Sequence, residues 1–233
     1  MVTKMYVNHR DGQRERILTG ARDLFVDRGI SAVTLGEVAT AAGITRATLY
    51  KYFTNKEQLA RALFQATTRR WVERGAREVW PLPGTGFERV ERFVTSHCRA
   101  MFRDPREARF VAEFNALYAR EWPVEQMAPL LAETLGGERL ALQASVVQGQ
   151  GDGSLRVDLP PEALVAQIFN FVSGMMDRFG AMGDKVEGEY GVAAQTVFEG
   201  INRVFLDGLR GRSNGCHPNP DPARRPGRRH KKA

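Results

Sequence analysis

Two short segments with helix-start signals, joined by one glycine, constrain the fold of this chain more than any other feature. Thr34 stands three residues before Glu37, so its hydroxyl and the Glu37 carboxylate can each bond a free backbone N–H at a helix start. Gly43 follows where that helix should end, and Thr45 can cap a second helix after a very short turn. The spacing therefore predicts a helix-turn-helix unit with a polar outer face on its second helix.

The outer face of this predicted second helix has side chains suited to DNA. Arg46 and Thr48 could reach base edges, and Ala47 is small enough to approach a thymine methyl group. For each residue taken alone, packing or solvation is a more common role than DNA contact, so the prediction rests on their joint spacing. Further residues of the unit offer hydroxyls or positive charge for phosphates; these are Thr34, Thr45, Tyr50, Lys51, Tyr52 and Lys56.

The run from Ile17 to Leu59 resembles the DNA-binding domain of the TetR family of bacterial transcriptional regulators. Its most specific part is LYKYFTNKEQL, from Leu49 to Leu59. The resemblance covers about the first quarter of the chain in detail. It implies a repressor that binds a double-stranded DNA operator as a homodimer and is released by a small-molecule effector. It also implies that the residues facing DNA are Thr34, Thr45, Arg46, Ala47, Thr48, Tyr50, Lys51, Tyr52 and Lys56.

Charge is distributed unevenly along the chain, whose formal net charge is +7. Residues 1–56 carry 9 basic and 5 acidic side chains, whereas residues 57–209 carry 17 basic and 21 acidic ones. Residues 210–233 carry 8 basic side chains and 1 acidic one. Because DNA phosphates attract positive charge, the two ends are better candidates for DNA contact than the mildly acidic middle.

The remaining bulk features favour a cytoplasmic protein. The two cysteines, Cys98 and Cys216, are far apart and lack CxxC spacing, so we expect no disulfide framework. The N-terminal residues lack the apolar core of a signal peptide, and no apolar run approaches the ~20 residues that a membrane span needs. No cofactor or metal is expected.

The remaining periodicity predicts an all-α protein of roughly nine helices. The expected domains are a three-helix DNA-binding domain over 11–56, a helical-bundle domain for ligand binding and dimerisation over 57–210, and a basic disordered tail over 211–233. Thr54 or Asn55 is expected to cap the helix that joins the two domains, with Glu57 completing a box with Thr54. The other predicted helices are 11–28, 56 to about 80, 87–102, one from 105 to 123, 124–147 with a possible break at 136–137, 162–181 and 190–209.

The last two predicted helices are apolar around much of their circumference. A helix of this kind must be buried on more than one side. For the end of a chain of this size, the second surface is expected to be another copy of the protein. The sequence therefore predicts a homodimer that pairs through these two helices.

Aromatic and methionine side chains of the C-terminal part could surround an apolar cavity or fill a solid core. The family resemblance favours a cavity. His97 is interpreted first as a buried, hydrogen-bonded histidine and second as a ligand or base, and the pair Cys216–His217 is too small for a zinc site. The candidate ligand-binding residues are Phe93, His97, Met101, Phe110, Phe114, Tyr118, Trp122, Phe169, Met175 and Met176.

Two other functions remain as alternatives to a ligand-responsive regulator. An architectural DNA-binding protein could rely on the basic tail and would bind with a steep salt dependence. An enzyme could use the C-terminal cavity, although the sequence lacks a Gly-x-Ser-x-Gly elbow, an HExxH pair and any convergent catalytic set.

Overall fold

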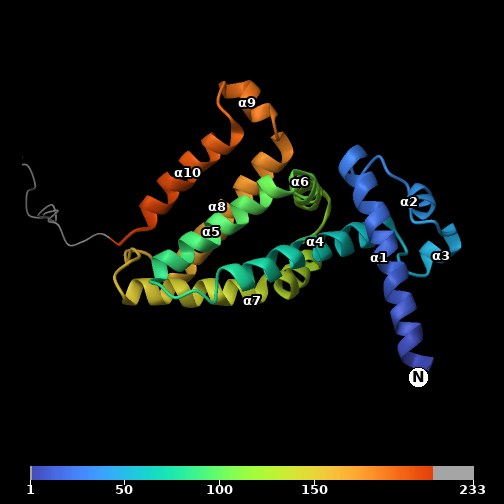
Figure 1. The fold of residues 1–233 in the computed structure, drawn as a ribbon, viewed down its shortest axis with the longest axis horizontal. Helices are drawn as coiled ribbons and strands as arrows, with labels where there is room; N and C mark the ends of the chain where they lie inside the picture. Colours follow the sequence, from blue (N-terminus) through green and yellow to red (C-terminus); the bar gives the residue numbers. More distant parts are fainter. Residues whose placement is uncertain (1, 212–233) are drawn as a thin grey trace, which may run out of the picture.

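The computed structural model describes residues 2–211, with side chains from residue 12 onward, and most of this range is helical (Figure 1). The all-α prediction is confirmed, with ten helices in the described range against the roughly nine expected. A single antiparallel bridge, between Leu155 and Arg210, is its one extended pairing. The helices are α1 (Val2–Arg28), α2 (Leu35–Ala41), α3 (Arg46–Tyr50), α4 (Lys56–Glu78), α5 (Gly86–Arg103), α6 (Pro105–Glu121), α7 (Val124–Gly151), α8 (Pro161–Met182), α9 (Lys185–Tyr190) and α10 (Ala194–Leu209).

Helices α1 to α3 form a small unit at one end of the molecule, and α4 leads from it into the larger helical part (Figure 1). Phe25, Val38 and Leu49 are fully buried where the three helices meet, because their helical spacing places them on facing sides. The expected start of the first helix at residue 11 was wrong, since α1 begins at Val2. The predicted start was placed after residues 2–10 because these residues are mostly polar. Polarity alone, however, does not prevent helix formation.

The larger part of the molecule is a bundle in which α6 packs along α8 and α5 packs along α7. At Gly180 of α8 a methyl group would lie 2.6 Å from the Ala108 carbonyl oxygen of α6. The backbones of α6 and α8 therefore approach each other closely, and only glycine allows this separation. Buried side chains form one continuous core from α1 through α10.

Two predicted boundaries in the bundle were wrong. Helix α7 continues through Gly136 and Gly137 and ends only at Gly151, four residues beyond the predicted end at residue 147. A helix tolerates exposed glycines at a modest cost when its neighbours hold it in place. The predicted last helix is divided into α9 and α10, because Gly191 takes a left-handed conformation at φ 66° and ends α9.

Two polar contacts join the small N-terminal unit to the bundle through α6. The Ile30 backbone N–H, just beyond the end of α1, donates to the Glu113 Oε1 at 2.6 Å. An exposed ion pair between Arg106 and Asp27, 2.7 Å apart, lies on the same two helices. The two parts are thus connected by α4 in the chain and by α6 in space.

The predictions about the basic tail, Cys216 and His217 concern residues 212–233, which lie outside the described range.

Candidate functional site

The start of α2 is held by a network of hydrogen bonds around Glu37. The Thr34 N–H and Oγ1 donate to Glu37 Oε2 at 2.8 Å and 2.7 Å, and Arg28 donates to Glu37 Oε1 at 2.6 Å. These donors, Thr34 first, lower the pKa of Glu37 to about 2. The predicted capping box is therefore present, and its carboxylate stays ionised at neutral pH.

The turn and the start of α3 also follow the predicted pattern. Gly43 takes φ 65°, which lets the chain reverse between the two helices. Thr45 Oγ1 accepts the Thr48 N–H at 3.1 Å and lies 2.9 Å from the Thr48 hydroxyl. Helix α3 is short and ends at Tyr50, while Leu49 within it and Phe53 just beyond it are both buried.

The outer side of α3 exposes four neighbouring residues of the predicted DNA-facing set, Arg46, Ala47, Tyr50 and Lys51. The Arg46 guanidinium lies across the first turn of α2, where a methyl group added at Gly36 would lie 2.1 Å from its Nη2 atom. Gly36 thus leaves space for this side chain, a role that the sequence pattern did not reveal.

Two other predicted phosphate contacts already have partners inside the protein. The Tyr52 hydroxyl donates to Gln13 Oε1 of α1 at 2.7 Å. Lys56 Nζ donates to the carbonyl oxygens of Ser31 and Val33 at 2.7 Å and 3.0 Å. The ammonium therefore binds the loop between α1 and α2, and one of its three N–H groups remains for another acceptor.

The start of α4 is capped by one of the two expected residues. Asn55 is the cap, and its Oδ1 accepts the Gln58 N–H at 2.8 Å, while Gln58 Oε1 accepts the Thr54 N–H at 3.0 Å. Glu57 instead forms an ion pair with Arg61, one turn along the helix. The predicted box between Thr54 and Glu57 was wrong, because the chain enters the helix one residue later than that pairing requires.

The candidate ligand-binding residues fall into two aromatic clusters. One cluster joins α5 to α8: the Phe93 ring lies 4.4 Å from His97 and 5.6 Å from Phe169. The other joins α6 to α1 and α4, with Phe110 stacked on Phe25 at 6.3 Å and Phe114 stacked on Phe64 at 4.2 Å. Trp122 packs against Phe114 in the second cluster.

The remaining candidates are less central to these contacts. Met101 and Met176 are buried, whereas Tyr118 and Met175 are partly exposed. The rings therefore pack on one another, and a bound molecule would have to displace some of them.

His97 is buried, as its first interpretation expected, and it faces a carboxylate that the sequence analysis missed. His97 Nδ1 lies 3.0 Å from the Phe93 carbonyl oxygen, and Nε2 lies 3.4 Å from Glu138 Oε2 of α7. Burial disfavours the charged ring, but the Glu138 carboxylate outweighs this effect and raises the pKa of His97. Glu138 stands three and seven residues from the apolar Leu135 and Leu131, and this spacing could have identified it as a buried carboxylate.

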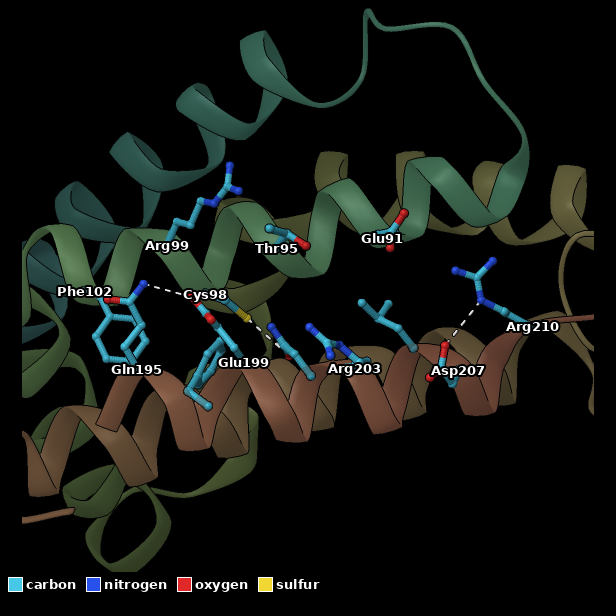
Figure 2. Close-up of a pocket in the computed structure, with 13 residues that line it drawn as sticks. Glu91, Thr95, Cys98, Arg99, Phe102, Gln195, Glu199, Arg203, Asp207 and Arg210 are labelled. Atoms are coloured by element: carbon cyan, nitrogen blue, oxygen red, sulfur yellow. Dashed lines mark hydrogen bonds and ion pairs between the residues drawn. The ribbon is translucent and has the colours of Figure 1, made fainter. Parts of the chain in front are cut away.

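A cleft of about 590 Å³ lies between α5 and α10 (Figure 2). On its buried side the Cys98 thiol lies 3.7 Å from Asn202 Oδ1, and burial raises the pKa of Cys98 to about 12. The thiol is therefore protonated at neutral pH and is a poor nucleophile. Charged side chains of both signs surround the opening; these are Glu91, Arg99, Glu199, Arg203, Asp207 and Arg210.

An apolar strip on α10 faces away from the bundle core. Val204 is 75% exposed, and Val192 and Ile201 are also exposed. Phe205 beside them stacks on Phe171 of α8, with the two rings 3.7 Å apart and nearly parallel. These residues lie on the two predicted helices, 162–181 and 190–209, that the sequence predicted to pair with another copy.

Within residues 2–211, no group of three or more His, Cys, Asp or Glu side chains is arranged to hold a metal ion. The helices of this same range are all too short or too polar to cross a membrane.

In the N-terminal unit, the short helix α3 is exposed on α1 and α2, and a larger helical bundle follows. This arrangement defines a helix-turn-helix DNA-binding protein. Residues 17–63 match the family model described as "Bacterial regulatory proteins, tetR family". The chain is 27% identical over 187 residues to the HTH-type transcriptional regulator YdeS of Bacillus subtilis, covering 77% of this chain and 84% of that protein. It is 39% identical over 56 residues to the transcriptional activator FasR of Mycolicibacterium smegmatis, covering 24% of this chain and 26% of FasR.

The whole fold is also similar to a solved structure. The transcriptional regulator FadR of Bacillus subtilis, in complex with stearoyl-CoA, superposes with a TM-score of 0.65 at 18% identity, covering 84% of this chain and 99% of FadR. Residues 17–63 match a TetR-family DNA-binding domain, and the chain is a DNA-binding transcriptional regulator similar to members of that family. The relatives named above are transcriptional regulators and not enzymes.

Proposed function

We propose that the chain is a dimeric repressor that binds a two-fold symmetric operator and releases it when a small molecule enters the helical bundle. The observation that most directly supports this proposal is the exposed face of α3. Arg46 and Ala47 on this face are exposed to solvent, and the helix packs against α1 and α2 on its other side. A recognition helix enters the major groove with its N-terminal residues first. Arg46, Ala47 and Thr48 would read bases, and repression is the sign of regulation that the family resemblance implies.

The remaining DNA-facing residues would position the helix on the phosphates. Lys51 and Tyr50 are exposed and have groups suited to phosphate oxygens. Thr34, Thr45, Tyr52 and Lys56 take part in hydrogen bonds within the protein, so they would contribute through remaining donors and by fixing the backbone. On this proposal the DNA-binding domain spans 11–56 and the ligand-binding and dimerisation domain spans 57–210.

Dimerisation through α8 and α10 explains the exposed apolar strip. Val204 and Ile201 would lose their contact with water against a second copy, which is favourable for apolar surface. A methyl group added at Gly174 of α8 or at Gly200 of α10 would meet no atom within 4 Å, so each glycine leaves room for a neighbouring helix. Two copies would then present their recognition helices to successive major grooves, about 34–36 Å apart.

An effector in the bundle would act on the DNA-binding unit through α6. The rings of Phe110 and Phe114 connect α6 to α1 and α4, and Glu113 of α6 binds the end of α1. A ligand that favours one position of α6 would shift the population of DNA-competent states. FadR, with the same fold, was solved in complex with stearoyl-CoA, which is a precedent for a small-molecule ligand of a regulator with this fold.

Selection of binding sites from a random DNA pool, with full-length protein at near-physiological salt, tests this proposal. We expect a palindromic motif with half-sites about one helical turn apart or at a multiple of that spacing. Binding without an enriched motif, lost steeply as salt rises, would contradict it and favour the architectural alternative. In that case deletion of residues 211–233 should abolish binding, whereas a regulator should keep most of its specific affinity.

A further inference from the structure

One carboxylate in the bundle lacks hydrogen-bond donors. Glu138 of α7 is 3% exposed, and neither of its oxygens accepts a hydrogen bond from the described residues. The His97 ring nitrogen 3.4 Å away supplies opposite charge when protonated, but it is not directed at the carboxylate as a hydrogen-bond donor. Buried carboxylates are normally both paired and hydrogen-bonded, because burial removes their hydration.

Gly75 of α4 makes the space that the second oxygen of Glu138 occupies. Oε1 faces Gly75 of α4, where a methyl group would lie 3.2 Å away. Any larger side chain at Gly75 would crowd this oxygen. By contrast, the other buried carboxylate between helices, Glu107, is bound by both Arg70 and the Trp71 indole N–H. The bundle therefore has the means to satisfy a buried carboxylate and leaves Glu138 unsatisfied.

A largely apolar groove, whose lining includes one charged residue, Arg139, lies between the two helices that carry Glu138 and Phe169. It has a volume of about 380 Å³ between α7 and α8, and its lining includes Leu131, Leu135 and Phe169. The Phe169 ring contacts Phe93, and Phe93 contacts His97, the ion-pair partner of Glu138. Phe169, Phe93 and His97 thus lie in series between the groove and Glu138, and a ligand that reaches Glu138 from the groove must displace the two phenylalanine rings.

We propose that Glu138 anchors an effector that is an apolar primary amine, with its body in the α7–α8 groove and its ammonium group donating to the Glu138 carboxylate. An ammonium group supplies the hydrogen bonds that the carboxylate lacks, and the faces of Phe93 and Phe169 attract a cation. Because Glu138 carries one negative charge, the ammonium replaces His97 as its partner. His97 then remains neutral, with its Nδ1–H donating to the Phe93 carbonyl oxygen. This inference rests on the proposed function, since it names the class of effector.

The test compares two probes that differ only in their head group, 4-phenylbutylamine and 4-phenylbutan-1-ol. Isothermal titration calorimetry on the full-length protein without DNA measures both affinities. We expect the amine to bind wild-type protein on the order of tenfold more tightly than the alcohol, because only the amine forms a charge-assisted hydrogen bond. Glu138→Gln should remove this preference. Glu125→Gln, an exposed glutamate on the same helix, is the matched control and should keep it.

Equal affinities for the two probes, no binding of either, or an amine preference that survives in Glu138→Gln would overturn the assignment. If Glu138→Gln does not fold, Ala166→Trp provides the decision. Ala166 is an exposed residue of the groove lining, so a tryptophan there should block the groove while leaving Glu138 in place. Ala166→Trp must lose amine binding, and retention of full affinity would place the amine elsewhere.

Operator release separates this inference from the proposed function. If a palindromic operator is selected but amine binding does not depend on Glu138, the proposed regulatory function is supported and the proposed amine site is wrong. If the amine binds through Glu138 without changing operator affinity, the amine site is supported but it is not the effector site.

Discussion

Threonine hydroxyls at the two helix starts are already bonded within the protein. Thr34 donates to the Glu37 carboxylate, and the Thr45 oxygen accepts the Thr48 N–H. Each hydroxyl therefore fixes its helix start before DNA is present, which lowers the entropy cost of ordering the interface on binding. Arg46 differs from these residues, because its guanidinium lies over Gly36 without a hydrogen-bonded carboxylate to hold it.

Separate substitutions of Arg46 and Lys51 should distinguish a residue that determines sequence specificity from one that contributes to DNA affinity in general. Arg46→Ala should cost about 1–3 kcal/mol on the selected operator and little on random DNA, since a base contact is lost. Lys51→Ala should weaken binding to both DNAs alike and reduce the salt dependence by about one phosphate contact. Fluorescence anisotropy over a range of salt concentrations measures both effects. An unchanged ratio of operator to random affinity in Arg46→Ala would show that another residue reads the bases.

At the scale of the helix, α10 is the element whose apolar side chains are least covered by other residues within a single chain. Its inner face packs Phe198, Leu206 and Leu209 into the core, while Ile201 and Val204 on another face remain exposed. The stacked rings of Phe171 and Phe205 hold α10 against α8 beside this strip. Such a division of apolar residues between two faces is expected for a helix with two packing partners.

A charge on this strip should separate the two copies. Val204→Glu should raise the dissociation constant of the dimer on the order of tenfold or more, because an unpaired carboxylate would be buried at the interface. Analytical ultracentrifugation over a concentration series measures this change. Val157→Glu is the matched control, since Val157 is 72% exposed but lies outside α8 and α10. A dimer equally stable in both variants would mean that another surface forms the interface.

For the whole molecule, the relation between the DNA-binding unit and the bundle depends on few polar groups. The contact between Glu113 and the Ile30 N–H closes the end of α1 against α6, whereas the ion pair of Arg106 with Asp27 is exposed and weakly stabilising. The aromatic rings of Phe25 and Phe110 supply the apolar part of the same joint. Because of these contacts, a movement of α6 would change the position of the end of α1.

Removal of the Glu113 carboxylate should loosen this joint. Glu113→Ala should lower the protection of the Ile30 amide against hydrogen exchange by about 1–3 kcal/mol, since a charged hydrogen bond is lost at a partly buried donor. Exchange followed by NMR measures this local change. Glu121→Ala, on the same helix but exposed, should leave the Ile30 amide unaffected. Equal protection in wild type and Glu113→Ala would exclude this contact as the connection.

Local signals in the sequence were sufficient for the helix-turn-helix unit. Thr34, Glu37, Gly43 and Thr45 act within four residues of their partners, so their roles are readable from spacing alone. Helix boundaries were harder: α1 extends through polar residues, and α7 continues through two glycines. Both depend on the balance between intrinsic preference and packing, which periodicity does not report.

Long-range partners were decided only by the tertiary structure. Glu138 and His97 lie on different helices 41 residues apart, and Glu113 contacts a backbone N–H 83 residues away. Lys56 likewise appeared free in the sequence, whereas the fold brings the carbonyl groups of Ser31 and Val33 to it. The sequence by itself determined the all-α class and the unit that faces DNA, because helix caps and periodicity are local interactions. The packing of helices determined which charged groups are buried and paired, because desolvation and ion pairing depend on neighbours distant in the chain.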